Sequence, residues 1–167
     1  MSGASPRGDK ARVTVQVPVP PKVAFEVFTG EIDLWWRRGP RFRFSGRSPG
    51  VLHFEPRLGG RLFESFGEGP EVRVFEAGRI RVLEPPARLV FEWRNLKFKP
   101  GETTEVEVRF EANASGTAVT VEHRGWATLP AEHPARHGLA GGEFSRQLGL
   151  WWGALGAAFR EHLSAGR

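Results

Sequence analysis

Few side chains in this sequence combine a reactive group with an apolar setting, and His123 is the clearest of them. It continues the alternation of Val119 and Val121, so a strand there places the imidazole on the apolar face. In a pocket, such a histidine could hydrogen-bond a ligand carbonyl or hydroxyl, or act as a general acid or base. The favoured alternative is a core or strand-end histidine that is satisfied by a backbone group.

The remaining motifs do not indicate catalysis. His133 and His137 have the spacing of a metal-binding pair on a helix, but Pro134 lies between them and no convincing third ligand is found. The glycines within 138–142 follow no phosphate-binding template, and no serine lies in a nucleophile elbow. We therefore predict no metal and no cofactor, and we favour a protein that is not an enzyme.

The segment 37–47 is rich in arginine. It contains Arg37, Arg38, Arg41, Arg43 and Arg47. The simplest interpretation is a solvated loop. The alternatives are a positive rim that attracts an anionic ligand or an acidic protein, and, because Phe42 and Phe44 lie among the arginines, single-stranded nucleic acid. Nucleic acid is the least favoured of the three, since acidic residues interrupt the basic charge elsewhere in the chain.

Composition narrows the class of protein. The 167 residues are 40% hydrophobic, which suits one domain with a real core. There are 13 Phe and 6 Trp but no Tyr, and the net charge is +5. The lack of Cys excludes disulfides, zinc–thiolate sites and thiol catalysis. Because no apolar segment resembles a signal peptide or a membrane span, we expect a cytoplasmic protein with no membrane span.

The pattern of apolar and turn residues predicts one α+β domain over residues 11–167, after a flexible tail at residues 1–10. A strand at 12–18 precedes a helix that ends at Gly30 and a short helix at 31–36. A long loop follows at 37–50, and a short strand at Phe42 to Phe44 is considered within it. Six strands are predicted at 51–56, 61–66, 72–84, 88–95, 103–112 and 116–125. A loop or frayed helix start at 130–142 leads to the last helix.

The last helix, 144–163, carries a wide aromatic face that must dock on the sheet. Its apolar residues recur at steps of three and four, and Trp151 and Trp152 are hard to pack tightly. We therefore predict a ligand cavity between this helix and a curved sheet, with a completely filled core as the alternative. The residues expected to line it are Phe25, Phe28, Trp35, Phe63, Phe91, Trp93, Val108, Phe110, Val121, His123, Trp151, Trp152, Leu155 and Phe159.

The order of elements and several short motifs resemble the SRPBCC superfamily of START and Bet v 1-like proteins. Within it, they are most similar to the family related to the C-terminal domain of the activator of Hsp90 ATPase. The motifs are PPKVAFEVF at 20–28, DLWW at 33–36, EPRLGGR at 55–61, GRIRVLEPP at 78–86, LVFEW at 89–93 and TVEH at 120–123. The resemblance covers roughly 12–163 and implies a helix-grip fold, in which a curved antiparallel sheet wraps around a long C-terminal helix.

Three functions follow from these observations. The first is the binding of an apolar small molecule in the cavity. The second, implied by the resemblance, is contact with a chaperone or another protein, as in the activators of Hsp90. The third is a cyclase- or hydrolase-like enzyme, which would need an acid or base such as His123 in the pocket. An exposed strand edge or the tryptophan-bearing helix could also support a homodimer.

Overall fold

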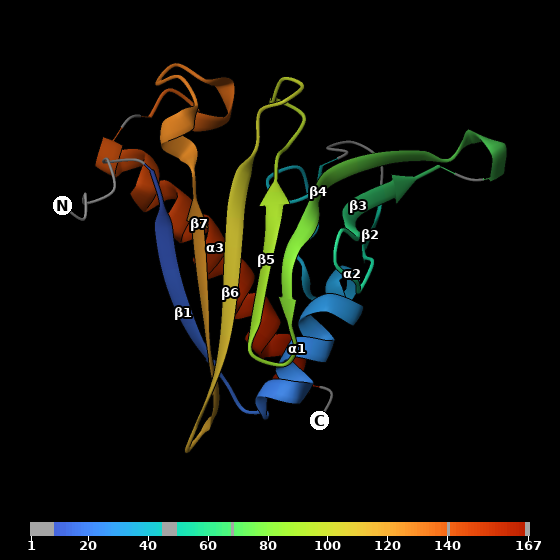
Figure 1. Cartoon of the computed structure of the whole chain (residues 1–167), viewed down its shortest axis with the longest axis vertical. Coiled ribbons are helices and arrows are strands. Elements are labelled where there is room, and N and C mark those ends of the chain that lie inside the picture. Colours follow the sequence, from blue (N-terminus) through green and yellow to red (C-terminus); the bar gives the residue numbers. More distant parts are fainter. Residues whose placement is uncertain (1–8, 45–49, 68, 140, 166–167) are drawn as a thin grey trace.

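The computed structural model describes residues 9–44, 50–67, 69–139 and 141–165, which form a curled antiparallel sheet with helices packed inside the curl (Figure 1). The seven strands of these residues lie in the order β1-β7-β6-β5-β4-β3-β2. Their bounds are β1 Ala11–Val17, β2 Val51–Phe54, β3 Arg61–Phe66, β4 Arg73–Glu84, β5 Arg88–Trp93, β6 Thr104–Asn113 and β7 Gly116–Arg124. The helices are α1 Pro21–Gly30, α2 Ile32–Trp35 and α3 Gly141–Ala165. Short 3-10 turns are η1 Gly69–Glu71, η2 Trp126–Thr128 and η3 Pro134–Arg136.

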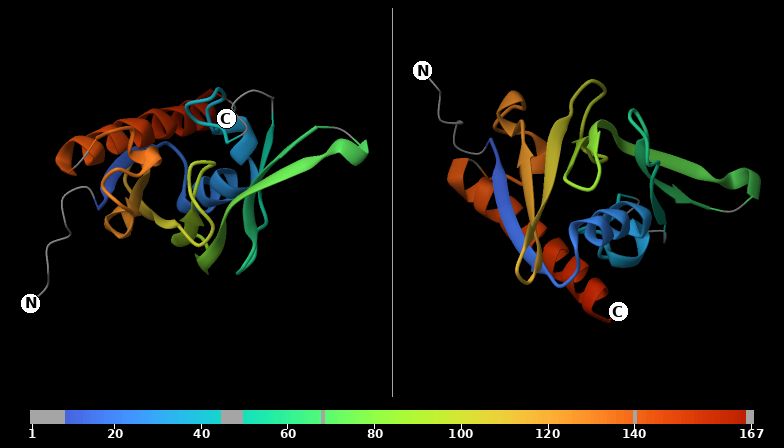
Figure 2. Two further views of the ribbon diagram at one scale, coloured as in Figure 1. Left: turned by 90° about the horizontal axis from the view of Figure 1, so that it is seen from above. Right: turned by 60° about the horizontal axis from the view of Figure 1, so that its bottom comes forward.

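The sheet bends most strongly at β4, which pairs with β3 over one part of its length and with β5 over another. The β3–β4 register shifts between Leu62 and Phe63, and the β4–β5 register shifts between Ile80 and Val82. Such bulges increase the local twist of a strand. At Gly78 a side chain is excluded, because a Cβ there would lie 1.7 Å from the carbonyl oxygen of Glu92. The curl is visible in the two views of Figure 2.

The helices form because their apolar residues fall on one face, and α1 also begins with a proline that suits the first turn. Pro21 occupies the first position of α1, where its missing N–H costs no hydrogen bond. The buried face of α1 is Ala24, Phe25, Val27, Phe28 and Thr29. The buried residues of α3 are Phe144, Leu148, Trp152, Leu155, Phe159 and Leu163. Helix α3 lies along β1, and α1 and α2 fill the space between α3 and the strands on the other side.

One end of this arrangement is packed solid, and we call it the packed end. There Phe28 of α1 contacts the rings of Phe110 and Phe159, at centroid distances of 5.8 and 5.5 Å. Phe25 lies 5.2 Å from Phe110, and Trp35 lies 4.9 Å from Phe159. All five side chains are buried. The first two helices therefore close the interior at the end of the sheet where the chain passes from β1 into α1.

The α+β class, the helix-grip architecture and the order of the elements agree with the prediction from sequence. The helix expected at 144–163 begins earlier, at Gly141, and the segment before it contains the short turn η3. The short strand considered at Phe42 to Phe44 is wrong, because these residues form a turn and a bend. Most of the expected tail at 1–10 lies outside the described residues. Asp9 accepts hydrogen bonds from the backbone of Trp126 and Ala127.

Candidate functional site

A pocket of about 560 Å³ opens at the opposite end of the sheet from the packed end, and we call this region the pocket end. It is formed by the segment after α2, the end of β5 with the loop that follows, the turns η2 and η3, and the first turns of α3 (Figure 1). The lining residues are Pro40, Arg41, Phe42, Arg43, Phe44, Trp93, Asn95, Leu96, Lys97, Trp126, Ala135, His137, Phe144, Gln147, Leu148 and Trp151.

The walls of the pocket are aromatic. Trp151 stacks on Phe42 with the rings 22° from parallel and their centroids 5.8 Å apart, and it meets Trp93 edge-on at the same distance. Trp126 packs against Phe144 at 4.7 Å. Trp93, Trp126 and Phe144 are buried, so Phe42 and Trp151, which are half-buried, are the most exposed of these rings. The lining of the pocket is therefore largely apolar and aromatic.

Two indole N–H groups in these walls lack a hydrogen-bond partner among the described residues. They belong to Trp93 and Trp126, and both nitrogens are buried. The indole N–H of Trp151, in contrast, donates to the carbonyl oxygen of Arg41 at 2.7 Å. That bond ties the first half of α3 to the segment after α2, so Trp151 both forms a wall and fixes the neighbouring one.

Buried Arg43 holds the segment after α2 in place. Its guanidinium donates to Asp33 Oδ1 at 2.6 Å, to the carbonyl of Trp36 at 2.8 Å and to the carbonyl of Arg37 at 3.1 Å. Asp33 also accepts from the backbone N–H of Leu52 at 2.9 Å. Burial raises the pKa of Asp33, but the bonds from Arg43 and Leu52 outweigh it, and the net pKa is below the ordinary value. The ion pair therefore fixes the pocket wall that carries Phe42 and Phe44.

The other arginines of this segment have two roles. Some hold the segment in place, and one lies at the rim of the pocket. Arg37 donates to the carbonyl of Ala154 on α3 at 2.9 Å, and Arg38 pairs with Asp33 at 3.2 Å. Arg41 is exposed, lines the pocket and lies over the ring of Phe42 at 5.4 Å. Arg47 lies outside the described residues. Of the arginines expected at a positive rim, Arg41 therefore lies where a ligand in the pocket could meet its charge.

His123 does not line the pocket but lies behind Trp93 and Trp126, at centroid distances of 5.0 and 5.1 Å, and has both ring nitrogens engaged. Nδ1 accepts from the indole N–H of Trp152 at 3.0 Å, so Nε2 carries the proton and donates to Thr104 Oγ1 at 2.7 Å. Thr104 in turn donates to the carbonyl of Trp93 at 2.8 Å. Complete burial lowers the pKa of His123 to about 3. The histidine is thus a neutral core group, and its partners are side chains rather than the backbone group expected.

The structure places the other residues expected to line a cavity in three locations. Trp93 and Trp151 line the pocket. Phe63 lies on the opposite face of β3 from buried Leu62 and stacks on His53 at 4.7 Å. The others lie in the core between the sheet and the helices, and they are Phe25, Phe28, Trp35, Phe91, Val108, Phe110, Val121, Trp152, Leu155 and Phe159.

Sequence reasoning missed the loops that form most of the pocket. Phe42 and Phe44 were considered only as part of an arginine-rich loop, and Leu96, Lys97, Trp126 and His137 were not singled out for this site. A usable signal was that the segments 94–103 and 125–139 follow strands β5 and β7 at the same end of the antiparallel sheet, and both contain apolar residues. Loops rich in apolar residues at one end of the strands indicate that this end is covered.

His133 and His137, which are spaced like metal ligands, have separate roles. His133 is buried, its Nε2 lies 2.8 Å from Glu102 Oε1, and its Nδ1 accepts from the backbone N–H of Ala135. It therefore holds the turn η3, which presents Ala135 to the pocket. No cluster of three or more residues suited to a metal ion occurs in the described part of the chain.

Comparison with known proteins agrees with this architecture. The chain matches the family model of activator of Hsp90 ATPase homolog 1-like proteins over residues 18–148. A solved protein from Mesorhizobium loti is 16% identical, with a TM-score of 0.65 over 95% of this chain and 98% of its own. A solved protein from Rhodobacter sphaeroides is 18% identical, with a TM-score of 0.65 over 98% of this chain and 97% of its own. No match was found among the curated proteins.

A third solved structure, of DynU16, a putative protein in the dynemicin biosynthetic locus, is 24% identical with a TM-score of 0.64. The match covers 95% of this chain and 48% of DynU16. At these identities the solved structures show the fold alone, which is a helix-grip fold. The chain belongs to the family of activator of Hsp90 ATPase homolog 1-like proteins. This fold generally serves ligand binding or association with chaperones.

The helices of the described residues include none with the length and apolar character that a membrane crossing requires.

Proposed function

We propose that this protein binds a small, largely apolar aromatic molecule in the pocket between the loops of the pocket end and the first half of α3. The observation that carries the proposal is the aromatic wall of Phe42, Trp93, Trp126 and Trp151 around a volume of about 560 Å³. A solid core would fill such a space with side chains. Here the rings surround it instead, and Arg43 and the Trp151 indole bond hold them in position.

The apolar surface is large enough to matter energetically. Burying about 200 Å² of ligand surface contributes about 5 kcal/mol at roughly 25 cal/mol per Å². Association and ordering remove part of that gain. One or two polar contacts at the rim then bring the affinity into the micromolar range, which corresponds to about 8 kcal/mol. The proposal therefore predicts binding that calorimetry can measure.

An acid–base enzyme is less well supported. Its candidate group, His123, is completely buried, uses both ring nitrogens in hydrogen bonds and does not line the pocket. Contact with a chaperone stays a prediction from the family, and a pull-down with the chaperone would test it. Neither alternative has a geometric feature comparable with the pocket.

The test is a calorimetric titration with 2-naphthamide, a flat and uncharged aromatic probe. The variant Gln147→Trp places a large ring at the pocket mouth, because Gln147 is an exposed residue of α3 that lines the pocket. Leu150→Trp is the matched control, since Leu150 is 61% exposed on the same helix and does not line the pocket.

We expect the wild type and Leu150→Trp to bind the probe with similar affinity, and Gln147→Trp to bind at least about tenfold more weakly, a loss of about 1.4 kcal/mol. Absence of binding to the wild type, or equal binding by the two variants, would contradict the proposal.

A further inference from the structure

The charged groups at the mouth of the pocket are of one sign. The cations Arg41 and Lys97 line it together with His137, and no Asp or Glu is found among its described lining residues. Arg43 lines it too, but Asp33 neutralises that guanidinium in a buried pair. Asn95 and Gln147 complete the polar part of the lining. The rest of the surface is apolar, so the electrostatic character of the pocket comes from its basic rim.

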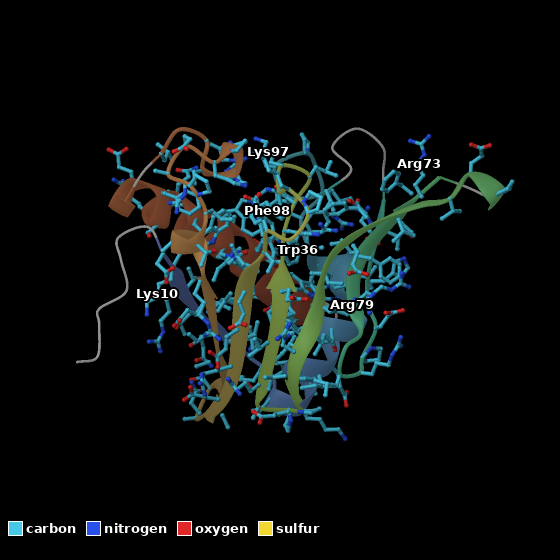
Figure 3. The ribbon with its side chains drawn as sticks, turned by 45° about the horizontal axis from the view of Figure 1, so that its top comes forward. Lys10, Trp36, Arg73, Arg79, Lys97 and Phe98 are labelled. Carbon is cyan, nitrogen blue, oxygen red and sulfur yellow. The ribbon has the colours of Figure 1, made fainter. Side chains whose placement is uncertain are left out.

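Lys97 carries a charge that nearby carboxylates do not compensate. It lies in the loop after β5 and is exposed, and it forms no ion pair within the described residues. Its Nζ lies 3.4 Å from Nδ1 of His137. Figure 3 places Lys97 and its neighbour Phe98 at the pocket end, away from Lys10.

His137 acts as a neutral acceptor for this ammonium group. Burial lowers the pKa of His137, and the charge of Lys97 lowers it further, so the imidazole is neutral at neutral pH. Nδ1 then accepts from Lys97 and orients the ammonium group without cancelling its charge. The backbone of His137 has φ +52°, a left-handed conformation that non-glycine residues adopt only at some cost in energy. His137 adopts it as the cap of the turn η3, where its backbone N–H donates to the carbonyl of Pro134.

We propose that the pocket selects aromatic ligands that carry an anionic group, a carboxylate or an ionised phenol, with the anion against Lys97 and the rings against Phe42 and Trp151. This inference rests on the proposed function and adds the class of ligand. Opposite charges attract over the few ångströms of the pocket mouth, and walls of low polarity strengthen that attraction relative to water. The same basic rim would repel a cationic ligand.

The experiment compares probes that share one ring system and differ in charge. They are 2-naphthoate, 2-naphthamide and 2-naphthylmethylammonium, titrated calorimetrically at neutral pH and low salt. Because Lys97 is exposed, we expect 2-naphthoate to bind about three- to fivefold more tightly than 2-naphthamide, with the cation weakest. Salt at about 0.5 M should narrow the difference, since it screens charges more than a few ångströms apart.

Variants assign the preference to one side chain. Lys97→Met should reduce the affinity for 2-naphthoate to that for 2-naphthamide and leave the amide unchanged, whereas Lys97→Arg should keep the preference. Lys22→Met is the control, because Lys22 is an exposed residue of α1 that does not line the pocket, and the variant makes the same change in net charge. It should leave all three affinities unchanged.

The outcomes separate this inference from the proposed function. If the amide binds but 2-naphthoate binds no better, the anionic class is wrong while the pocket stands as a site for apolar ligands. If Lys97→Met keeps the preference for 2-naphthoate, the placement of the anion against Lys97 is wrong. If none of the three probes binds, the proposed function fails and this inference fails with it. A preference that disappears in Lys97→Met but persists in Lys22→Met would support the inference.

Discussion

The packed end and the pocket end of this protein are built on the same sheet and the same helix, yet one is filled and the other hollow. At the packed end, α1 and α2 bring Phe25, Phe28 and Trp35 between the sheet and α3. At the pocket end, α1 and α2 do not enter that space, and the first half of α3, the end of β5 and three loop segments surround it. The loops line the space between the sheet and α3 without filling it. The comparison teaches that the chain's helices, rather than its aromatic content, decide where a cavity can exist.

Truncating a ring should cost most at the packed end. Phe28→Ala removes a buried side chain that contacts four other rings, and we expect it to lower the free energy of unfolding by about 3–5 kcal/mol. Phe42→Ala, in the half-buried wall of the pocket, should cost less than half as much. Urea denaturation measures both, and equal losses would show that the two ends are packed alike.

Removing the buried guanidinium of Arg43 should affect both stability and binding. Arg43→Met leaves the Asp33 carboxylate and four backbone carbonyls without this donor, and we expect a loss of about 2–3 kcal/mol together with weaker binding of 2-naphthamide. Arg38→Ala is the control, since Arg38 pairs with the same Asp33 but its side chain is 62% exposed, and it should cost at most about 0.5 kcal/mol. If Arg43→Met retained full affinity for 2-naphthamide, Arg43 would not be what holds the pocket wall.

Acidification should destabilise the core around His123. Burial lowers the pKa of this group to about 3 in the folded state, whereas the unfolded chain binds the proton at about 6.5. The unfolded state therefore holds more protons between these values, and stability falls as the pH falls through that window.

We expect the wild type to lose about 2 kcal/mol more than His123→Gln between about pH 7 and pH 5. Denaturation curves at the two pH values measure this difference. An equal pH dependence in both proteins would mean that His123 is accessible to protons in the folded state.

The smallest expected effect is a gain in stability on α3. Gly149 lies inside the helix near the pocket, and a Cβ there would meet no atom within 4 Å. Gly149→Ala should raise the free energy of unfolding by about 0.5–1 kcal/mol, because alanine loses less backbone entropy on folding. Binding of 2-naphthamide should not change. A loss of stability would indicate that α3 is strained at this position.

Much of the fold followed from the sequence because its signals are periodic and local. Alternation along 116–124 predicted the inward face of β7, and apolar residues at steps of three and four predicted the buried face of α3. The position of the pocket depends on where α1 and α2 dock relative to the sheet. That is a tertiary property, and no single segment encodes it.

The candidate site was harder to predict than the fold for the same reason. Trp93 and Trp151 belong to regular elements whose faces could be assigned from the pattern, and both line the pocket. Phe42, Lys97 and His137 lie in loops, where side-chain direction follows from long-range contacts such as the bond between Trp151 and the carbonyl of Arg41. For His123, the strand position predicted burial, but the partners Trp152 and Thr104 come from α3 and β6.

The six tryptophans provide the most direct test, because Trp93, Trp126 and Trp151 line the pocket while Trp35, Trp36 and Trp152 do not. Two-dimensional NMR of the ¹⁵N-labelled protein resolves each indole N–H and can follow it during a titration with 2-naphthamide. We predict that the largest shifts occur at Trp93, Trp126 and Trp151, with the least change at Trp35 in the packed end. Shifts concentrated at Trp35 and Trp152, or no shift at any indole, would contradict a binding site at the pocket end.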